Sequence, residues 1–163
     1  MRTAIVFAFL AVLVTALPPP AEAQHTALGV YSEPEGWNCN LEDQAPGLQF
    51  AYVFLDQTTG ALGVRFRVEL SPDCTLLYLE DLPEGLWTSG NVVDGVTICF
   101  DQCVPLYQRR MLARITYYGF GTSAICSSME IKPIGPSAFI EAVSCDGTIH
   151  AASGFNMPVN NAA

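Results

Sequence analysis

Residues 64–70 read Val64-Arg65-Phe66-Arg67-Val68-Glu69-Leu70. Apolar and charged side chains alternate strictly along this stretch, which is the period of a β-strand with one buried face. The apolar set, which includes Phe66, should face a core, and the charged set, which includes Arg67, should face solvent. The stretch therefore predicts a half-buried strand in a β-sheet.

The segment before this strand predicts its partner. Residues 48–55 read Leu-Gln-Phe-Ala-Tyr-Val-Phe-Leu and are apolar on both faces apart from Gln49. This pattern is typical of a central strand that is covered on both sides. The connection, residues 56–60, ends in Gly60 and has the composition of a hairpin loop. We expect an antiparallel pair.

The rest of the chain repeats this organisation. Further strands are predicted at residues 28–32, 75–79, 92–100, 111–118, 125–132, 139–144 and 148–152. Turn sequences such as Pro34-Glu35-Gly36 and Asp146-Gly147 separate them at intervals of about 8–12 residues, and no window keeps a helical apolar stripe. The sequence predicts an all-β fold, an antiparallel β-sandwich of about eight to nine short strands.

The chain begins with a segment that has the features of a secretory signal peptide. Arg2 precedes an apolar run at residues 4–17, three prolines, and a small-x-small pattern that places cleavage after Ala23. The run is about fourteen residues, short of the roughly twenty that span a bilayer, so a retained anchor helix is the weaker alternative. We expect a signal peptide at 1–23, a sandwich at 24–152 and a flexible tail at 153–163. The mature chain should be exported, to the periplasm or outside the cell, without membrane insertion.

All six cysteines lie after the predicted cleavage point: Cys39, Cys74, Cys99, Cys103, Cys126 and Cys145. An even number in an exported chain indicates three disulfides, and six cysteines allow fifteen pairings. We expect sequence neighbours to pair. For Cys99 and Cys103 this requires a turn at residues 101–102, because an extended backbone separates their Cα atoms by about 13 Å.

Metal, cofactor and nucleic-acid binding are not expected. A zinc site would need a second ligand pair to match Cys99 and Cys103, and the two histidines, His25 and His150, stand apart near the chain ends. The net charge is −9, and removal of residues 1–23 takes away one acid and one base. Phosphate binding requires clustered cations, and this chain has a single lysine.

The order of three segments resembles a known class of exported proteins. Gly29-Val30-Tyr31, Phe50-Ala51-Tyr52-Val53-Phe54-Leu55 and Gly63-Val64-Arg65-Phe66-Arg67-Val68 are similar to strands of uncharacterised exported β-sandwich proteins of Gram-negative bacteria. Those proteins have a cohesin-like or immunoglobulin-like outline. The resemblance implies a sandwich over most of the mature chain and supplies no catalytic residues.

The sequence contains no catalytic motif for hydrolysis or nucleotide chemistry. Two groups of carboxylates, Glu42-Asp43 and Glu80-Asp81 with Glu84, are candidates for glycoside cleavage only because they are acidic, and solvated loop charges are the simpler interpretation. Five aspartates at predicted strand ends leave calcium as an alternative to plain turn formation: Asp56, Asp73, Asp94, Asp101 and Asp146.

Binding remains as the functional class. Trp37, Trp87 and Tyr107 fall in predicted loops, where sandwich folds place recognition residues. The alternative is that these rings cap the open ends of the sandwich. We therefore expect a non-catalytic binding or structural module for a protein or a glycan. The alternatives are a small hydrolase with a carboxylate pair, or an envelope or filament subunit whose edge strands pair between copies.

Overall fold

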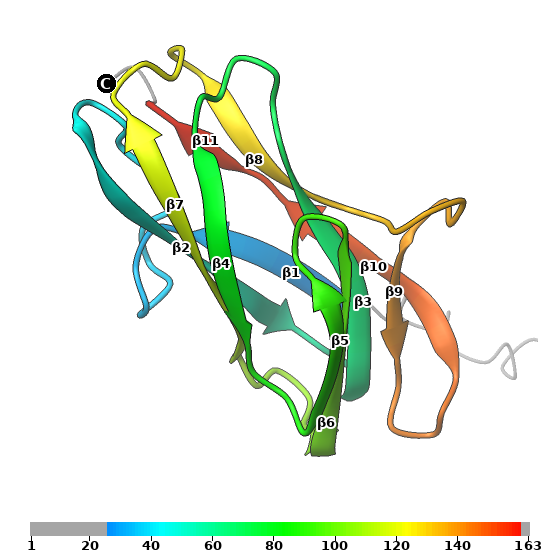
Figure 1. The fold of residues 1–163 in the computed structure, drawn as a ribbon. Coiled ribbons are helices and arrows are strands. Elements are labelled where there is room, and N and C mark those ends of the chain that lie inside the picture. The colour runs from blue at the N-terminus through cyan, green and yellow to red at the C-terminus, as the bar shows by residue number, and fades with distance from the viewer. Residues whose placement is uncertain (1–25, 161–163) are drawn as a thin grey trace, which may run out of the picture.

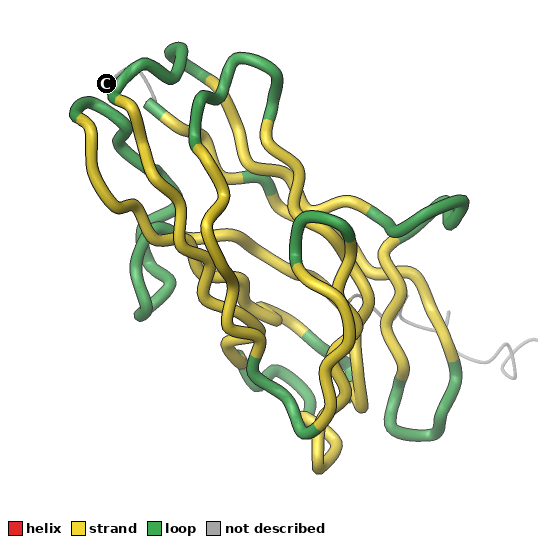
Figure 2. The backbone as a smooth tube through the Cα atoms, viewed as in Figure 1, coloured by secondary structure: helices red, strands yellow, loops and turns green. Residues whose placement is uncertain are grey.

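The computed structural model describes residues 26–160, which form eleven strands and no helix (Figures 1 and 2). The strands are β1 (Thr26–Tyr31), β2 (Pro46–Gln57), β3 (Ala61–Leu70), β4 (Leu77–Pro83), β5 (Trp87–Asn91), β6 (Gly95–Val104), β7 (Arg110–Phe120), β8 (Ser127–Lys132), β9 (Ile140–Val143), β10 (Ile149–Phe155) and β11 (Met157–Val159). The all-β prediction is confirmed. The predicted signal peptide, residues 1–23, and His25 lie outside the described residues.

The strands form two packed layers of one nearly closed sheet. One layer runs β1-β2-β7-β4, and the other contains β8, β3, β6 and β5. Strands β9 and β10 connect them, because β9 pairs with β3 and β10 pairs with β1. The sheet is mixed, since the β1 and β10 pair is parallel and the others are antiparallel.

The core lies between the layers and contains the apolar side chains of residues 64–70. Val64, Phe66 and Val68 of β3 are buried, whereas Arg67 is half-buried and points outward with Glu69. Phe66 pairs with Val96 of β6 and belongs to the same apolar cluster as Ile115 of β7. The alternation therefore predicted both the strand and its register.

Several strand boundaries differ from the sequence expectation. Residues 92–94, expected as the start of a strand at 92–100, are instead the turn that joins β5 to β6, and the strand begins at Gly95. Asn91 sets this turn, because its side-chain oxygen accepts hydrogen bonds from the backbone N–H groups of Val93 and Asp94. Trp87, expected in a loop, is consequently the first residue of β5.

Most of residues 153–160 lie in strands, where a flexible tail at 153–163 was expected. β10 runs to Phe155, and β11 pairs with β8 so that Met157 and Val159 are fully buried. Asn160, which follows β11, also contacts distant segments, because its side-chain amide donates to the backbone oxygens of Asp43 and Ser123. The three-residue β11 is too short for periodicity to reveal, and its stability comes from packing on the core.

The disulfide joins Cys103 to Cys145 and not to its sequence neighbour Cys99. Residues 101–102 lie within β6, so the turn that a Cys99–Cys103 bridge requires is absent. The bridge passes Gly60, whose φ of +108° and missing Cβ leave room for the sulfur atoms. The other four cysteines, Cys39, Cys74, Cys99 and Cys126, carry free thiols in this structure.

Substitution of Phe66 tests the register. Phe66→Asp places a carboxylate in the core and removes a buried ring, so we expect a loss of about 4 kcal/mol or more in unfolding free energy. Arg67→Asp on the outward face should cost about 1 kcal/mol. Chemical denaturation of both variants measures the difference, and equal midpoints would show that the register is wrong.

Removal of the disulfide should destabilise the fold through the unfolded chain. The bridge spans 42 residues, and closing a loop of that length lowers the entropy of the unfolded state by an amount worth about 4 kcal/mol. Cys103→Ser should therefore lower the unfolding free energy by about that amount. Cys99→Ser, which removes a free thiol from the same strand, is the matched control. Equal stability of the two variants under oxidising conditions would contradict the cross-link.

Candidate functional site

Trp37 lies in a closed loop that follows β1. The loop is closed at its base, where the backbone N–H of Ser32 donates to the oxygen of Asn38 at 2.9 Å. Inside it, the N–H of Gly36 donates to the oxygen of Glu33, which makes the Pro34-Glu35-Gly36 turn. The Trp37 side chain is 83% exposed, so the loop presents the indole ring to solvent.

Arg109 fixes this loop to the sandwich. Its Nη1 and Nη2 donate to the backbone oxygens of Glu35 and Gly36 at 3.2 and 2.7 Å, and its Nε donates to Oδ1 of Asp56 at 2.8 Å. Gly36 has a φ of +70°, and a Cβ there would collide with the Arg109 guanidinium. The glycine is therefore required both by the turn and by the close approach of the arginine.

Aromatic rings surround the Arg109 guanidinium. Its Cζ lies 4.4 Å from the ring centroids of both Tyr31 and Phe54, and 5.7 Å from that of Trp37. Tyr31 also donates its hydroxyl to Oδ2 of Asp56 at 2.6 Å. Burial and the Asp56 carboxylate together raise the pKa of Tyr31 to about 12, so the phenol stays protonated at neutral pH. The cluster is a rigid base of cation–π contacts and charge-assisted hydrogen bonds.

A groove of about 620 Å³ opens beside this base. Its walls are Val30, Tyr31, Gly36, Trp37, Cys39, Asp56, Gln57, Arg109, Phe155 and Asn156. Phe155 is more than half exposed. Trp37 and Phe155 are therefore two accessible aromatic side chains in the lining of the groove. Amide and carboxylate groups of Gln57, Asn156 and Asp56 in the same lining give the groove a few polar contacts, which is the composition of a binding site.

The other two predicted aromatics lie outside the groove. Tyr107 is exposed in the loop between β6 and β7 with a φ of +61°, and its N–H donates to the oxygen of Thr58. Trp87 is exposed on β5, an edge strand of the other layer, and pairs with Cys99. The structure therefore does not bring the three predicted rings together.

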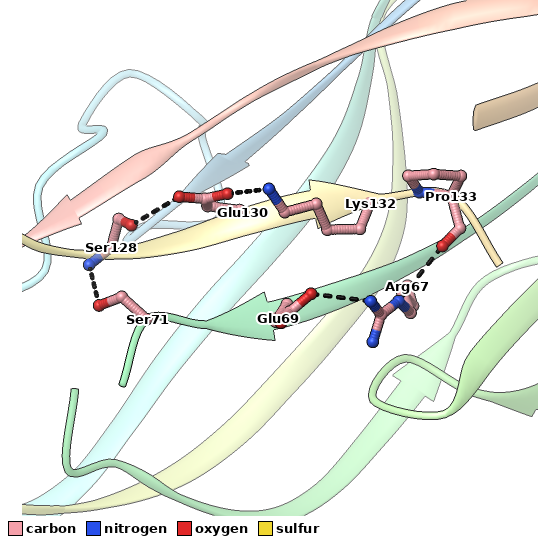
Figure 3. Close-up of polar contacts among 7 residues, drawn as sticks. All are labelled: Arg67, Glu69, Ser71, Ser128, Glu130, Lys132 and Pro133. Carbon is pink, nitrogen blue, oxygen red and sulfur yellow. Dashed lines mark hydrogen bonds and ion pairs between the residues drawn. The ribbon is translucent and has the colours of Figure 1, made fainter. Parts of the chain in front are cut away.

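The outward faces of the two layers differ in polarity. On the β3 and β8 face, Arg67 pairs with Glu69 at 2.8 Å, and Lys132 pairs with Glu130 (Figure 3). Ser71 and Ser128 extend this network, since the Ser128 hydroxyl donates to Glu130 and its N–H to Ser71 (Figure 3). This face is satisfied by its own ion pairs.

The outward face of the β2-β7-β4 layer is apolar. Strand pairing places its side chains in three rows, Leu48-Tyr118-Leu77, Phe50-Thr116-Glu80 and Tyr52-Arg114-Leu82, with Phe120 beyond the first row. We call this set of residues the apolar face. The strand at 48–55 was expected to be covered on both sides, which is wrong for the outward side, where Leu48 is 60% exposed.

The carboxylate pairs of the hydrolase alternative do not converge. Asp81 points inward, where it accepts hydrogen bonds from the Tyr78 hydroxyl and, at 3.4 Å, from the N–H of Val92, whereas Glu80 is exposed on the apolar face. Adjacent residues of a strand point to opposite sides of the sheet. The two carboxylates therefore cannot act on one bond.

Asp43 is buried and has a structural role. It accepts hydrogen bonds from the Gly121 N–H, the Ser123 N–H and the Ser123 hydroxyl, at 2.7 to 3.2 Å. Burial raises the pKa of Asp43, but these hydrogen bonds outweigh it and hold the pKa below its usual value. The carboxylate joins the segment before β2 to the segment after β7.

His150 lacks the partners of a catalytic base. Its Nε2 lies 3.0 Å from the Thr26 hydroxyl, but its buried Nδ1 has no hydrogen-bond partner. A nucleophile and base need a third group to orient the imidazole, and none contacts it among the described residues.

Three of the five aspartates of the calcium alternative are engaged with separate partners. Asp56 binds Arg109, Asp101 binds Arg110 and Asp146 binds Ser144. Within residues 26–160, no three histidine, cysteine or acidic side chains are grouped as a metal site. In the same part of the chain, no helix is long and apolar enough to cross a bilayer.

Arg109 and Phe155 are the site residues that sequence analysis missed. Arg109 was not singled out as a site residue, and Phe155 lay in the expected tail at 153–163. One usable signal was Gly36 next to Trp37, because a glycine in a turn beside an aromatic indicates close approach of another group. No signal in the sequence placed Arg109 opposite that turn.

Cohesin modules of known structure share this fold. The sixth cohesin of scaffoldin B from Acetivibrio cellulolyticus, solved with a Cel5 dockerin, is 14% identical with a TM-score of 0.57, and the match covers 85% of this chain and 99% of that one. A cohesin module of a family 33 glycoside hydrolase from Clostridium perfringens is 9% identical, with a TM-score of 0.60 and the same coverage. The non-cellulosomal cohesin of Archaeoglobus fulgidus is 12% identical, with a TM-score of 0.55, covering 85% and 92%.

These likenesses establish the fold and confirm the cohesin-like outline indicated by the order of the strands. No family model and no curated protein matches the chain.

The pH dependence of stability tests the role of Asp43. Because its pKa is lowered in the folded state, its contribution is present above the ordinary aspartate pKa of about 3.9 and is lost as the pH falls through the folded value. Asp43→Asn should cost about 2 kcal/mol at pH 7, and the difference from wild type should shrink below about pH 4. Urea denaturation at both pH values measures this. A difference that stays constant across the range would assign the loss to shape alone.

Proposed function

We propose that this chain is an exported, non-catalytic protein-binding module that holds a segment of its partner in the Trp37 groove. The observation that carries the proposal is the exposed indole of Trp37 on a loop that Arg109 fixes in place. Burial of an exposed tryptophan is a frequent source of binding energy at protein interfaces.

Rigidity of the loop supports the proposal. Binding to a mobile loop costs conformational entropy, and a loop already held in its bound shape avoids that cost. Two side-chain donors of Arg109 bind this loop before any partner arrives. The guanidinium is itself held by Asp56 and by the rings of Tyr31 and Phe54. A role as an end cap would instead bury Trp37 against the sandwich, and its ring is exposed.

The known structures of this fold support a protein partner over a glycan. The scaffoldin B cohesin of Acetivibrio cellulolyticus is in a complex with a dockerin, and a cohesin of Clostridium thermocellum, 11% identical with a TM-score of 0.59, is also in a complex with one. We take from them only that the fold suits protein capture. The place where this chain would bind its partner is argued from its own groove. The walls of that groove combine two exposed aromatic rings with amide and carboxylate groups.

Export is part of the proposal. The expected signal peptide at 1–23 and cleavage after Ala23 direct the chain to the periplasm or the outside. The Cys103–Cys145 bridge supports this location, because disulfides persist in oxidising compartments.

Removal of the indole tests the groove. Immobilised residues 24–163 would be used to capture proteins from the culture medium and envelope extract of the source cells. Trp37→Ala should reduce capture of a specific protein by about thirtyfold or more in affinity, with the melting temperature unchanged. Trp87→Ala, which removes an equally large exposed ring outside the groove, is the matched control, and Tyr107→Ala tests the neighbouring loop.

Two outcomes would contradict the proposal. If Trp37→Ala keeps its partner and loses several degrees of melting temperature, the indole is a structural cap. If protease treatment of the extract leaves capture intact while glycosidase treatment abolishes it, the ligand is a glycan.

A further inference from the structure

The apolar face of the β2-β7-β4 layer is exposed to solvent, although its side chains have the composition of a buried surface. Its large apolar side chains are exposed by between 38%, at Phe50, and 60%, at Leu48, and they include Leu77, Leu82 and Phe120. Leu79, in the β4 irregularity, is exposed beside them. Six half-exposed side chains of about 200 Å² each offer roughly 600 Å², the upper end of what a monomer leaves exposed.

The composition of β2 shows that this area is not incidental. Its inward side chains, Val53 and Leu55, are in the core, while its outward side chains, from Leu48 to Tyr52, are equally apolar. A strand with two apolar faces is characteristic of burial on both sides. By contrast, the outward face of β3 and β8 carries charged side chains that form ion pairs with one another (Figure 3).

We infer that the apolar face binds the same face of a second copy of this chain, which forms a two-fold symmetric dimer. The area supports this occupant, because a stable interface buries about 800 Å² per partner, and the half-buried side chains of Tyr52, Tyr118 and Arg114 add to the exposed apolar area. Two aligned sheets packed about 10 Å apart form such an interface.

Charge complementarity selects a second copy rather than another apolar partner. The face carries one cation, Arg114, and one anion, Glu80, and neither forms an ion pair within residues 26–160. Nε of Arg114 is buried without a hydrogen-bond partner, and its Cζ lies 5.9 Å from the Phe50 ring. Nε itself is closed to solvent, but the Arg114 side chain is half-buried, so the accessible part of the guanidinium can take a carboxylate acceptor from a second copy.

A two-fold symmetric dimer supplies a carboxylate acceptor to Arg114 of both copies. Glu80 lies in the Thr116 row and Arg114 in the next row, one strand away. A two-fold axis that crosses the strands between these rows brings Glu80 of each copy beside Arg114 of the other. Such a contact is isologous, because the same patch is used by both copies. The net charge of −9 opposes association, but salt screens it beyond about 8 Å, and the face itself is neutral.

Charge reversal tests the dimer. Sedimentation equilibrium of residues 24–163 with the disulfide formed should show a monomer–dimer equilibrium with a dissociation constant in the micromolar range. Glu80→Arg and Arg114→Glu should each weaken dimerisation at least tenfold, because each places like charges together. The double variant E80R/R114E should return to within about threefold of wild type, because it restores opposite charges.

Controls separate the interface from folding and from the groove. Glu69→Arg makes the same charge change on the β3 face and should leave the dimer intact. Leu77→Glu, at an exposed position, should also abolish the dimer, and it covers the case in which Arg114→Glu fails to fold. Trp37→Ala should remain dimeric, so loss of partner capture and loss of the dimer are distinguishable. A wild-type chain that is monomeric at about 0.5 mM, or a double variant no more dimeric than the single ones, would overturn the inference.

Discussion

The two layers of the sandwich depend on the pairing of β3, which contacts β6, β8 and β9. Its apolar side chains form part of the floor of the core, and its backbone joins β6 to β9 on opposite edges at Gly63. The disulfide lies where this strand begins, beside Gly60. Pairing, core packing and cross-linking thus converge on one strand, and the layer that carries the groove is held through β9 and β10.

Sequence patterns predicted what depends on local periodicity. The alternation around Phe66 gave a buried face that the structure confirms, and turn residues such as Gly147 marked the hairpin between β9 and β10. Contacts between distant segments were not predictable in this way. Cys103 meets Cys145 only because β3 pairs with both β6 and β9, and spacing along the chain holds no record of that pairing.

The candidate site shows the same division. Trp37 was recognised from its loop, because an aromatic between turn residues indicates exposure, and the structure finds it exposed. The arginine that holds the Trp37 loop was not recognised. Arg109 is distant from Trp37 in the sequence and is brought to the loop only by the pairing of β1, β2 and β7. Trp87 had an equally suggestive local sequence, and only the sheet order shows that it lies in the other layer.

β2 connects the two proposals without making them one. Its carboxyl end supplies Asp56 and Gln57 to the Trp37 groove, and its amino-terminal half supplies Leu48 and Phe50 to the apolar face. The groove lies against β1 and β10, away from the edge strand β4, so a copy packed on the apolar face leaves the Trp37 loop accessible. A dimer built in this way carries two grooves. Two linked sites raise the effective concentration for a partner with repeated segments, so modest affinity at each groove suffices for firm capture.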